Sequence, residues 1–393
     1  MKDPKKHYLW AIFAGFLALL AVVYLGRGFS FLLSGPNLPV DLALRWWESK
    51  RLLVDGLNIY EQSKDAIYPP STLVFFFPVL AAIPYASADA VWAVVHLGSL
   101  GVLFWFAYST VRPFSLNLAL FTGAAVLAAQ ANGQQLGVGQ ITTIIMALVV
   151  LTLKIREWMP NSLVGSFLAS VTLAVAMGKV SISLPLCMVL FAIPGFRVIT
   201  VMAAVINLVV SQIVAATIGE NVISVALQIL ENTNTVRGLG SLDIHALGVA
   251  IGAPPEIGSV LSLLLLIGLG MVAWKFRRAN LMFLLALASI VGRFWTYHNH
   301  YDNTMLLFLP ISAALALSSI HKSDSDKTPG RVTVATLWLA MIVLSLVFPA
   351  RVLVYDAPFF GCFLMIQLVV WLTSVYLLFL FDGKTRIIKK ALF

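Results

Sequence analysis

Long apolar segments follow one another along almost the whole chain, and this succession limits the fold more than any other feature. The first runs from Tyr8 to Gly26, close to the ~20 residues that an untilted membrane-spanning helix needs. Only 11% of the 393 residues are charged, against roughly 25% in soluble domains. A soluble fold of this length could not bury so much apolar surface. The sequence therefore predicts an all-α integral membrane protein.

The apolar segments predict one polytopic membrane domain over residues 1–393, with about twelve transmembrane helices. Beyond the first, they lie near 71–85, 89–108, 114–131, 138–153, 162–178, 180–193, 198–218, 257–274, 280–297, 303–320, 332–349 and 359–381.

The segment 71–85 is the one that we expect not to cross the membrane. It is short, it follows two prolines, and Pro78 and Pro84 interrupt it. Orientation by charge also requires an odd number of crossings between Pro70 and Arg112. We expect 71–85 to form a re-entrant segment or to lie at the interface, where protein or a cavity covers its irregular backbone.

Basic residues set the orientation, because Lys and Arg accumulate in cytoplasmic loops. The chain begins with the basic Met1–His7 and shows no clear cleavage site after its first apolar run. We expect a multi-pass protein of the plasma (inner) membrane with both termini in the cytoplasm. The basic clusters are Lys154/Arg156, Lys275/Arg277/Arg278, Lys322/Lys327/Arg331 and Lys384/Arg386/Lys389/Lys390.

This orientation predicts two long segments on the non-cytoplasmic side, 27–70 and 219–258, the second forming two short helices around a break at Asn232–Gly240. The net charge of +9 is then explained by the basic cytoplasmic loops. The sequence has no basic stretch interleaved with aromatic residues that would indicate nucleic-acid binding. The two cysteines, Cys187 and Cys362, lie far apart in apolar segments, so neither a disulfide nor a metal site is expected.

The first long segment contains a rough amphipathic helix from Asp41 to Val54 that is suited to lying on the membrane. Asp41 stands at its start, where it is either an N-cap or a carboxylate at the membrane surface that acts as a general base. Gly56 and Asn58 are typical of a helix end and turn.

The pattern around this helix resembles the first external loop of glycosyltransferase family 87. The shared frame is an Asp at the head of a helix, a Leu-Leu-x-x-Gly-x-Asn-x-Tyr end, and a Tyr-Pro-Pro that enters the next apolar segment. Leu42 replaces the usual aromatic residue, and Ile59 replaces the usual proline. The matching residues are Asp41, Leu52, Leu53, Gly56, Asn58, Tyr60, Tyr68, Pro69 and Pro70.

Three later segments extend the resemblance to about residues 35–310. Gly139-Gln140-Ile141-Thr142 corresponds to a Gly-Gln-x-Asn motif, with Thr in place of Asn. Lys179 ends an apolar helix, although Pro185 follows later than the family's proline. The stretch from Arg293 to Asn303 matches a His-containing segment between late helices.

The resemblance implies a GT-C-type membrane enzyme that moves a hexose, usually mannose, from a polyprenyl-phosphate carrier to a lipid or glycan acceptor. The implied mechanism is a single inverting displacement on the non-cytoplasmic face, with no cofactor and no metal. Asp41 is the implied base, and a cation at the interface suits the phosphate of a membrane-embedded lipid. The implied phosphate-binding residues are Lys179, Arg293, His298 and His300, and the implied substrate-contacting residues are Tyr68, Gln140, Tyr297 and Asp302.

Each of these residues also has a simpler interpretation. Lys179 and Arg293 can reach the interface as snorkelling side chains, and the aromatic residues can belong to an interfacial belt. On a continuous helix, Arg293 would share a face with Tyr297 and His300, whereas His298 would neighbour Asp302; two histidines and an aspartate could bind a metal, although zinc needs three or four ligands. A secondary transporter, a flippase and a non-catalytic subunit for lipid-linked sugars remain as alternative functions.

Overall fold

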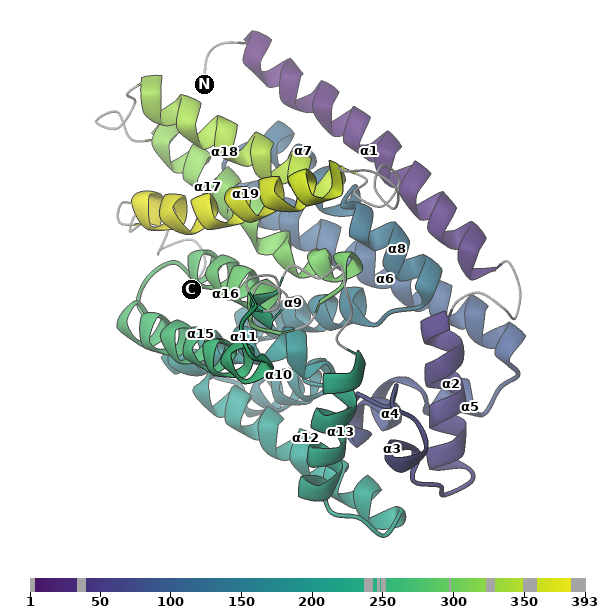
Figure 1. The fold of residues 1–393 in the computed structure, drawn as a ribbon. Coiled ribbons are helices and arrows are strands. Elements are labelled where there is room, and N and C mark those ends of the chain that lie inside the picture. Colours follow the sequence, from purple (N-terminus) through teal and green to yellow (C-terminus); the bar gives the residue numbers. More distant parts are fainter. Residues whose placement is uncertain are drawn as a thin grey trace.

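The computed structural model describes residues 4–33, 40–236, 243–245, 248, 252–296, 298–322, 329–348 and 359–382. Over these residues its regular structure is entirely helical, which confirms the predicted all-α class (Figure 1). The helices are α1 (Pro4–Leu32), α2 (Val40–Leu53), α3 (Ile59–Gln62), α4 (Pro70–Phe76), α5 (Pro78–Ala81), α6 (Tyr85–Val111), α7 (Leu116–Leu127), α8 (Gln130–Val138), α9 (Thr142–Trp158), α10 (Leu163–Ala176), α11 (Val180–Ala192), the 3-10 helix η1 (Pro194–Phe196), α12 (Arg197–Thr217), α13 (Val222–Val236), α15 (Pro255–Lys275), α16 (Leu281–Trp295), the 3-10 helix η2 (His300–Leu307), α17 (Phe308–Lys322), α18 (Pro329–Val347) and α19 (Phe359–Asp382).

Six helical stretches in the described residues are long and apolar enough to cross a membrane, or up to seven if a bent pair counts as one span. Several of the other apolar helices are short. For example, α11 has 13 residues, or about 20 Å of helix, against the ~30 Å of a hydrocarbon core. The count of about twelve crossings therefore stays a prediction.

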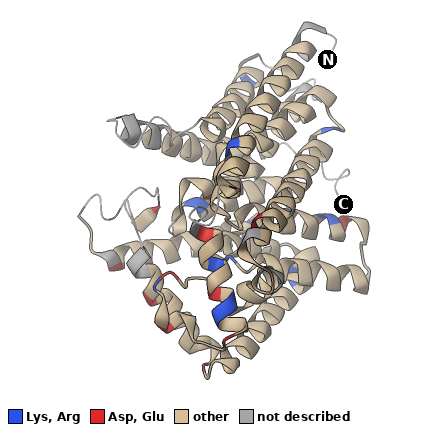
Figure 2. Ribbon diagram, turned by 90° about the vertical axis from the view of Figure 1, so that its right-hand side faces the viewer, with Lys and Arg blue, Asp and Glu red and all other residues tan. Residues whose placement is uncertain are grey.

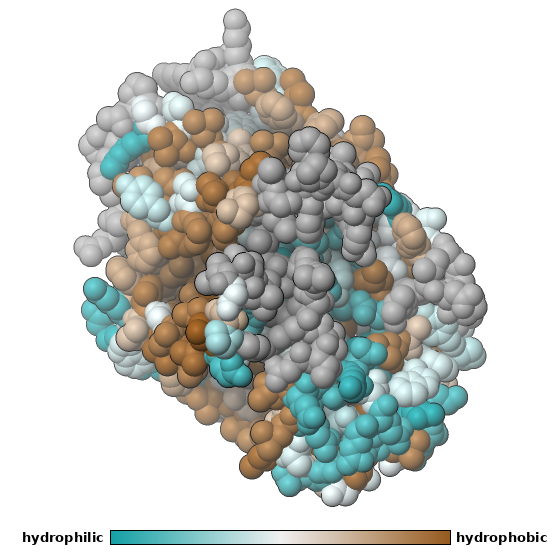
Figure 3. Space-filling view, viewed as in Figure 1, coloured by the Kyte–Doolittle hydropathy of each residue, from teal (hydrophilic) through white to brown (hydrophobic). Residues whose placement is uncertain are grey.

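The outer faces of the long helices carry large apolar side chains that no other part of the described chain covers. On α1, Ile12 and Leu19 are 65% and 62% exposed, and on α15 Met271 is 64% exposed. Hydrophobic residues cover much of the molecule in Figure 3, whereas hydrophilic residues gather in the region of α2 and α3. An exposed apolar surface of this extent is typical of a protein surrounded by lipid.

Glycines allow α1 and α8 to cross at very short distance. A Cβ on Gly28 would lie 2.2 Å from the carbonyl oxygen of Gly133, and a Cβ on Gly133 would lie 2.3 Å from the carbonyl oxygen of Tyr24. Small residues at a crossing let two backbones approach, as is common between membrane helices. This contact attaches α1 to the body of the protein.

The predicted apolar segments 114–131 and 138–153 largely form α7 and α9, and α8 lies between them. α7 is followed by α8, and a bend of 117° separates the pair α7–α8 from α9. Gly139 ends α8 with a left-handed φ of +77°. A Cβ at this position would also lie 2.3 Å from the Cβ of Leu42 on α2. Gly139 thus breaks the helix and lets α2 approach the break.

α2 confirms the helix predicted over 41–54, and Gly56, three residues after its end, turns the chain with a left-handed φ of +65°. Its charged residues are visible in Figure 2, which faces the right-hand side of Figure 1. Arg45 and Glu48 of this helix are nevertheless buried, because they form an ion pair against the rest of the protein. The amphipathic pattern predicted the helix but not that two of its charges are covered.

The segment 71–85 contains α4 and α5, with seven and four residues, before α6 begins at Tyr85. Neither short helix is a candidate span.

In the second long segment, α13 continues through Asn232 to Val236, so the helix does not yet break at Asn232; the rest of the expected break, residues 237–240, lies outside the described residues. The Asn232 amide donates to the carbonyl oxygens of Tyr60, Ser63 and Ala66, which ties α13 to the region of α3.

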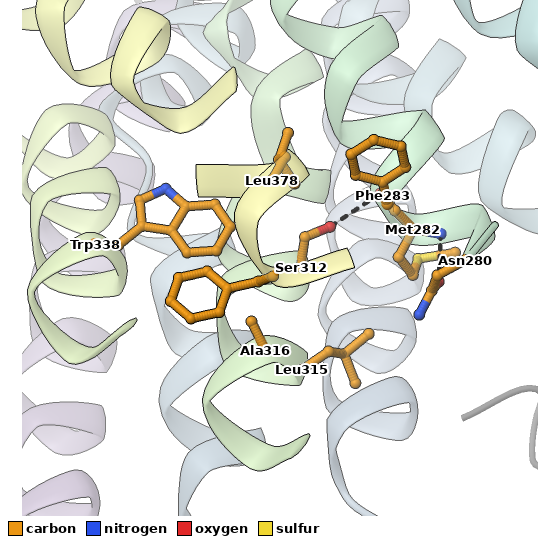
Figure 4. Close-up of a pocket in the computed structure, with 9 residues that line it drawn as sticks. Asn280, Met282, Phe283, Ser312, Leu315, Ala316, Trp338 and Leu378 are labelled. Carbon is orange, nitrogen blue, oxygen red and sulfur yellow. Dashed lines mark hydrogen bonds between the residues drawn. The ribbon is translucent and has the colours of Figure 1, made fainter. Parts of the chain in front are cut away.

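A small pocket of about 20 Å³ lies among α16, α17, α18 and α19, where the Ser312 hydroxyl donates to the Met282 carbonyl at 2.9 Å (Figure 4). Its lining is mainly apolar, and its volume suits about one water molecule. We regard it as a packing defect in the helix bundle.

Candidate active site

Three of the polar residues singled out in the sequence stand at helix beginnings that meet in space. Asp41 lies in the first turn of α2, Gln140 lies in the break between α8 and α9, and Lys179 is the residue before α11. Asp302 is the third residue of η2. Irregular backbone within the membrane domain is tolerated because it is packed against protein or lines a cavity.

A continuous chain of hydrogen bonds joins these four residues. The Gln140 amide nitrogen donates to Asp41 Oδ2 at 2.8 Å. Lys179 Nζ donates to Gln140 Oε1 at 3.2 Å, and it donates to Asp302 Oδ1 at 2.7 Å in a buried ion pair. The Thr142 hydroxyl accepts from Lys179 Nζ at 2.9 Å and donates to the same Asp302 oxygen at 2.6 Å. The ammonium group is therefore fixed in position on three sides.

His298 contacts the other side of Asp302, with 3.2 Å between His298 Nδ1 and Asp302 Oδ2. These two residues are neighbours, although the continuous helix that would have made them so is not present. α16 ends at Trp295, Thr296 is extended with φ −150° and ψ 173°, and a separate 3-10 helix begins at His300. No continuous helix therefore places Arg293, Tyr297 and His300 on one face.

Tyr68 is held from three directions beside this chain. Its hydroxyl donates to Gln140 Oε1 at 3.0 Å, its ring stacks under the Arg45 guanidinium at 4.7 Å, and its carbonyl accepts from the Tyr60 hydroxyl at 3.0 Å. Arg45 is itself paired with Glu48. The predicted substrate-contacting pair Tyr68 and Gln140 thus forms part of one rigid network with Asp41.

Burial dominates the ionisation of the two carboxylates of α2, which lies outside the candidate spans. Burial raises the pKa of Asp41 above its ordinary value of 3.8, while the Gln140 hydrogen bond and the nearby Arg45 and Lys179 charges oppose it. Burial raises the pKa of Glu48 to about 7 against the opposing charge of Arg45. A carboxylate whose pKa lies above its ordinary value is a stronger proton acceptor once it is ionised.

A cavity of about 790 Å³ opens beside this network. Its polar end is formed by Tyr68, Gln140, Lys179, Tyr301 and Asp302. Most of its remaining wall is apolar and comes from α12, α13 and α15, including Leu208, Val225, Ile229, Leu230, Leu263 and Leu266.

Of the other predicted site residues, those that the structure describes do not line this cavity. Asp41 is partly buried behind Gln140. Arg293 is fully buried; its Nε donates to Asn303 Oδ1 at 2.8 Å, and its guanidinium lies 5.6 Å from the Trp371 ring. His298 is buried behind Asp302, and His300 is partly buried. Tyr297 lies outside the described residues.

The structure adds residues that the sequence did not single out. Thr142 hydrogen-bonds to both members of the Lys179–Asp302 pair. The sequence could have indicated it, because Thr142 occupies the motif position at which the resembling family has Asn. The Tyr301 hydroxyl accepts from Asn299 at 2.6 Å and from Gln140 at 3.4 Å, although its residue type alone suggested only an aromatic belt. Arg45 was visible only as a charge on an amphipathic helix.

His298 and Asp302 are the pair nearest to a metal-ligand arrangement. Within the described residues, no group of three or more His, Cys, Asp or Glu side chains could hold a metal ion.

Comparison with known proteins gave one match. The family model described as glycosyltransferase family 87 matches residues 66–317, well over half of the chain. The matched range contains Tyr68, Gln140, Lys179 and Asp302, and it begins after Asp41. No curated protein and no solved structure matches the chain.

Proposed function

The chain belongs to glycosyltransferase family 87, and from this premise we propose that it moves a hexose, by the family default mannose, from a polyprenyl-phosphate carrier to a hydroxyl group of a lipid or glycan acceptor. As a family member with several apolar helices, it is a membrane glycosyltransferase. We place the reaction at the non-cytoplasmic face of the plasma membrane, with both termini in the cytoplasm.

The observation that carries the proposal is the amphiphilic character of the cavity. One end holds the Lys179 ammonium, and the remaining wall is largely apolar. Leu208 of α12, Leu230 of α13 and Leu263 of α15 line the cavity and are also 55%, 56% and 59% exposed, so the apolar part opens toward the lipid-facing surface. A polyprenyl phosphate has this same division, with a charged head and a long hydrocarbon chain that stays in the bilayer.

Asp41 is the base of the proposed mechanism. Gln140, which lines the cavity, donates to Oδ2, and within the described residues Oδ1 accepts no hydrogen bond. The proposal requires the acceptor hydroxyl to enter beside Gln140, where Oδ1 takes its proton. The resulting nucleophile attacks the anomeric carbon, and the bond to the phosphate breaks with inversion. One carboxylate suffices, because a phosphate leaves without protonation.

Negative charge grows on the departing phosphate, and preorganised positive charge stabilises it most in the transition state. Lys179 is the nearest candidate, since it lines the cavity and is fixed by Asp302, Thr142 and Gln140. His298 supports this arrangement from behind Asp302. Arg293 and His300 retain their proposed phosphate roles at longer range.

The test is transfer itself. Purified protein in lipid nanodiscs, given radiolabelled polyprenyl-phosphate-mannose and a lipid extract of the host membrane, should produce a labelled glycolipid. A flippase or a non-catalytic subunit would bind the same donor and transfer no label. A transporter would move a soluble solute across sealed vesicles, and such uptake without any transfer would reject the proposal.

A further inference from the structure

A second set of polar side chains lines the cavity, beside α15, and the proposed chemistry does not use it. The Ser262 hydroxyl lies 2.9 Å from His245 Nε2, and both residues line the cavity together with Ser259 one turn earlier on α15. Asn207 and Ser211, one turn apart on α12, add further polar groups to the lining. The charged residues of the lining among those described, Lys179 and Asp302, belong to the donor end.

The position of His245 is supported by two further features of the chain. A Cβ on Gly258 would lie 2.5 Å from His245 Nδ1, so the absence of a side chain at 258 makes room for the imidazole ring. The backbone N–H of His245 donates to Asp243 Oδ1 at 2.8 Å, which fixes the turn that carries the ring. The fixed turn and the space left at 258 therefore place the ring at the cavity wall.

The chemistry of this wall suits neutral hydroxyl groups. A hydroxyl has one donor and two acceptor sites, and the bond to His245 uses only one of those of Ser262. Ser262 therefore keeps hydrogen-bonding capacity toward an occupant of the cavity that a hydrocarbon chain could not use. A sugar acceptor presents several hydroxyls, and each is both donor and acceptor. A phosphate would instead seek the cation at the other end of the cavity.

We propose that His245 and Ser262, with Ser259, form the subsite that binds the sugar hydroxyls of the acceptor, so that the glycosyltransferase takes a glycan or glycolipid acceptor. This inference rests on the proposed function and assigns the sugar of the acceptor and the phosphate of the donor to different parts of one cavity. It predicts that acceptor binding and donor binding can be changed separately.

Binding measurements test the assignment without requiring turnover. The probes are octyl α-D-mannopyranoside for the acceptor and polyprenyl phosphate for the donor, each titrated into the purified full-length protein in nanodiscs. Ser262→Ala should raise the dissociation constant for the mannoside roughly 3- to 10-fold, the effect of one neutral hydrogen bond. His245→Phe should raise it further, and His245→Gln, which keeps a hydrogen-bonding group near Nε2, should restore part of the binding.

Ser289→Ala is the matched control, because Ser289 is buried on α16, bonds its own helix at the Leu285 carbonyl, and does not line the cavity. It should leave mannoside binding unchanged. Polyprenyl phosphate should bind all four variants as it binds the wild type. A wild type that does not bind the mannoside, or variants that lose polyprenyl phosphate instead, would overturn the subsite. Mannoside binding that depends on Ser262 in a protein that transfers no sugar would support the subsite and reject the transferase activity.

Discussion

At the level of single residues, Asp41→Asn changes one oxygen of the proposed base to a nitrogen. Asparagine matches the size of aspartate, and loss of one negative charge from the first turn of α2 costs only about 0.3–1 kcal/mol, so the fold should persist. The amide cannot take a proton, and the loss of a general base typically slows a reaction by ~10²–10⁴-fold. Sugar transfer should fall by this factor while donor affinity stays at the wild-type value.

The control for this variant is Glu61→Gln, which makes the same kind of change on an exposed carboxylate of α3. It should transfer sugar at the wild-type rate. Wild-type transfer by Asp41→Asn would remove Asp41 from the mechanism.

The pH dependence of transfer reports on the same group. A base must be ionised, so kcat/KM should fall as the pH drops through the pKa of Asp41, which burial has raised. The acid limb should therefore lie above the range of an exposed aspartate. Gln140→Leu removes a hydrogen bond that lowers this pKa and should move the limb to still higher pH. An unshifted limb in Gln140→Leu would assign the titration to another group.

Lys179 needs a paired design, because its removal leaves Asp302 as an uncompensated buried charge. Breaking one side of a buried ion pair typically destabilises a protein by about 3–5 kcal/mol. The double variant Lys179→Gln with Asp302→Asn stays neutral and should recover most of the thermal stability that Lys179→Gln loses. If Lys179 binds the phosphate, the double variant should still bind polyprenyl phosphate about 10- to 100-fold more weakly than the wild type.

Recovery of both stability and donor affinity in the double variant would show instead that Lys179 serves only to neutralise Asp302. Isothermal titration of polyprenyl phosphate, read beside the melting temperature, separates the two results.

At the level of elements, the crossing of α1 and α8 depends on glycine. Gly28→Ala places a methyl group within 2.2 Å of the Gly133 carbonyl oxygen, which α1 can relieve only by moving away. Overpacking of this kind usually costs about 1–3 kcal/mol, so the melting temperature in detergent should fall. Gly26→Ala on the same helix is the control, since nothing lies within 4 Å of its new Cβ. Equal melting temperatures for both variants would contradict the crossing.

The positions of the helices were largely predictable, because a run of apolar residues by itself predicts a membrane helix. The start of α2 at Val40 and the end of α16 at Trp295 lie within a few residues of the expected boundaries. The hydropathy pattern could not predict that Gly139 ends a helix, because a left-handed backbone conformation does not change the hydropathy of the stretch. The bend after α8 and the position of Gln140 between Asp41 and Lys179 follow from that single residue.

The site itself was only partly predictable. The order of the motifs indicated Asp41, Gln140, Lys179 and Asp302. The contacts of Asp41 with Gln140 and of Lys179 with Asp302 nevertheless span 99 and 123 positions of sequence, and tertiary packing sets them. His245 and Ser262 gave no motif signal, because a single histidine and a single serine among apolar residues are common in any membrane protein.

For the whole molecule, the sharpest expectation concerns the sides of the membrane. A reporter enzyme inserted after Gly240 should be active on the non-cytoplasmic side, and one inserted after Lys327 should be cytoplasmic, because the basic clusters retain their loops inside. The measurement uses two reporters in intact cells: alkaline phosphatase, which is active on the non-cytoplasmic side, and green fluorescent protein, which fluoresces in the cytoplasm. The same side for both reporters would require a different number of crossings between the two positions.

Gly139 has a consequence for the ways in which such a chain can change over generations. Any other residue there would meet Leu42 and strain the backbone, so a substitution at 139 must be accompanied by a shift of α2. Position 139 and the start of α2 are therefore expected to vary together or not at all. A library that randomises only the polar site residues would miss this coupling, and many inactive clones would carry every chemical group intact.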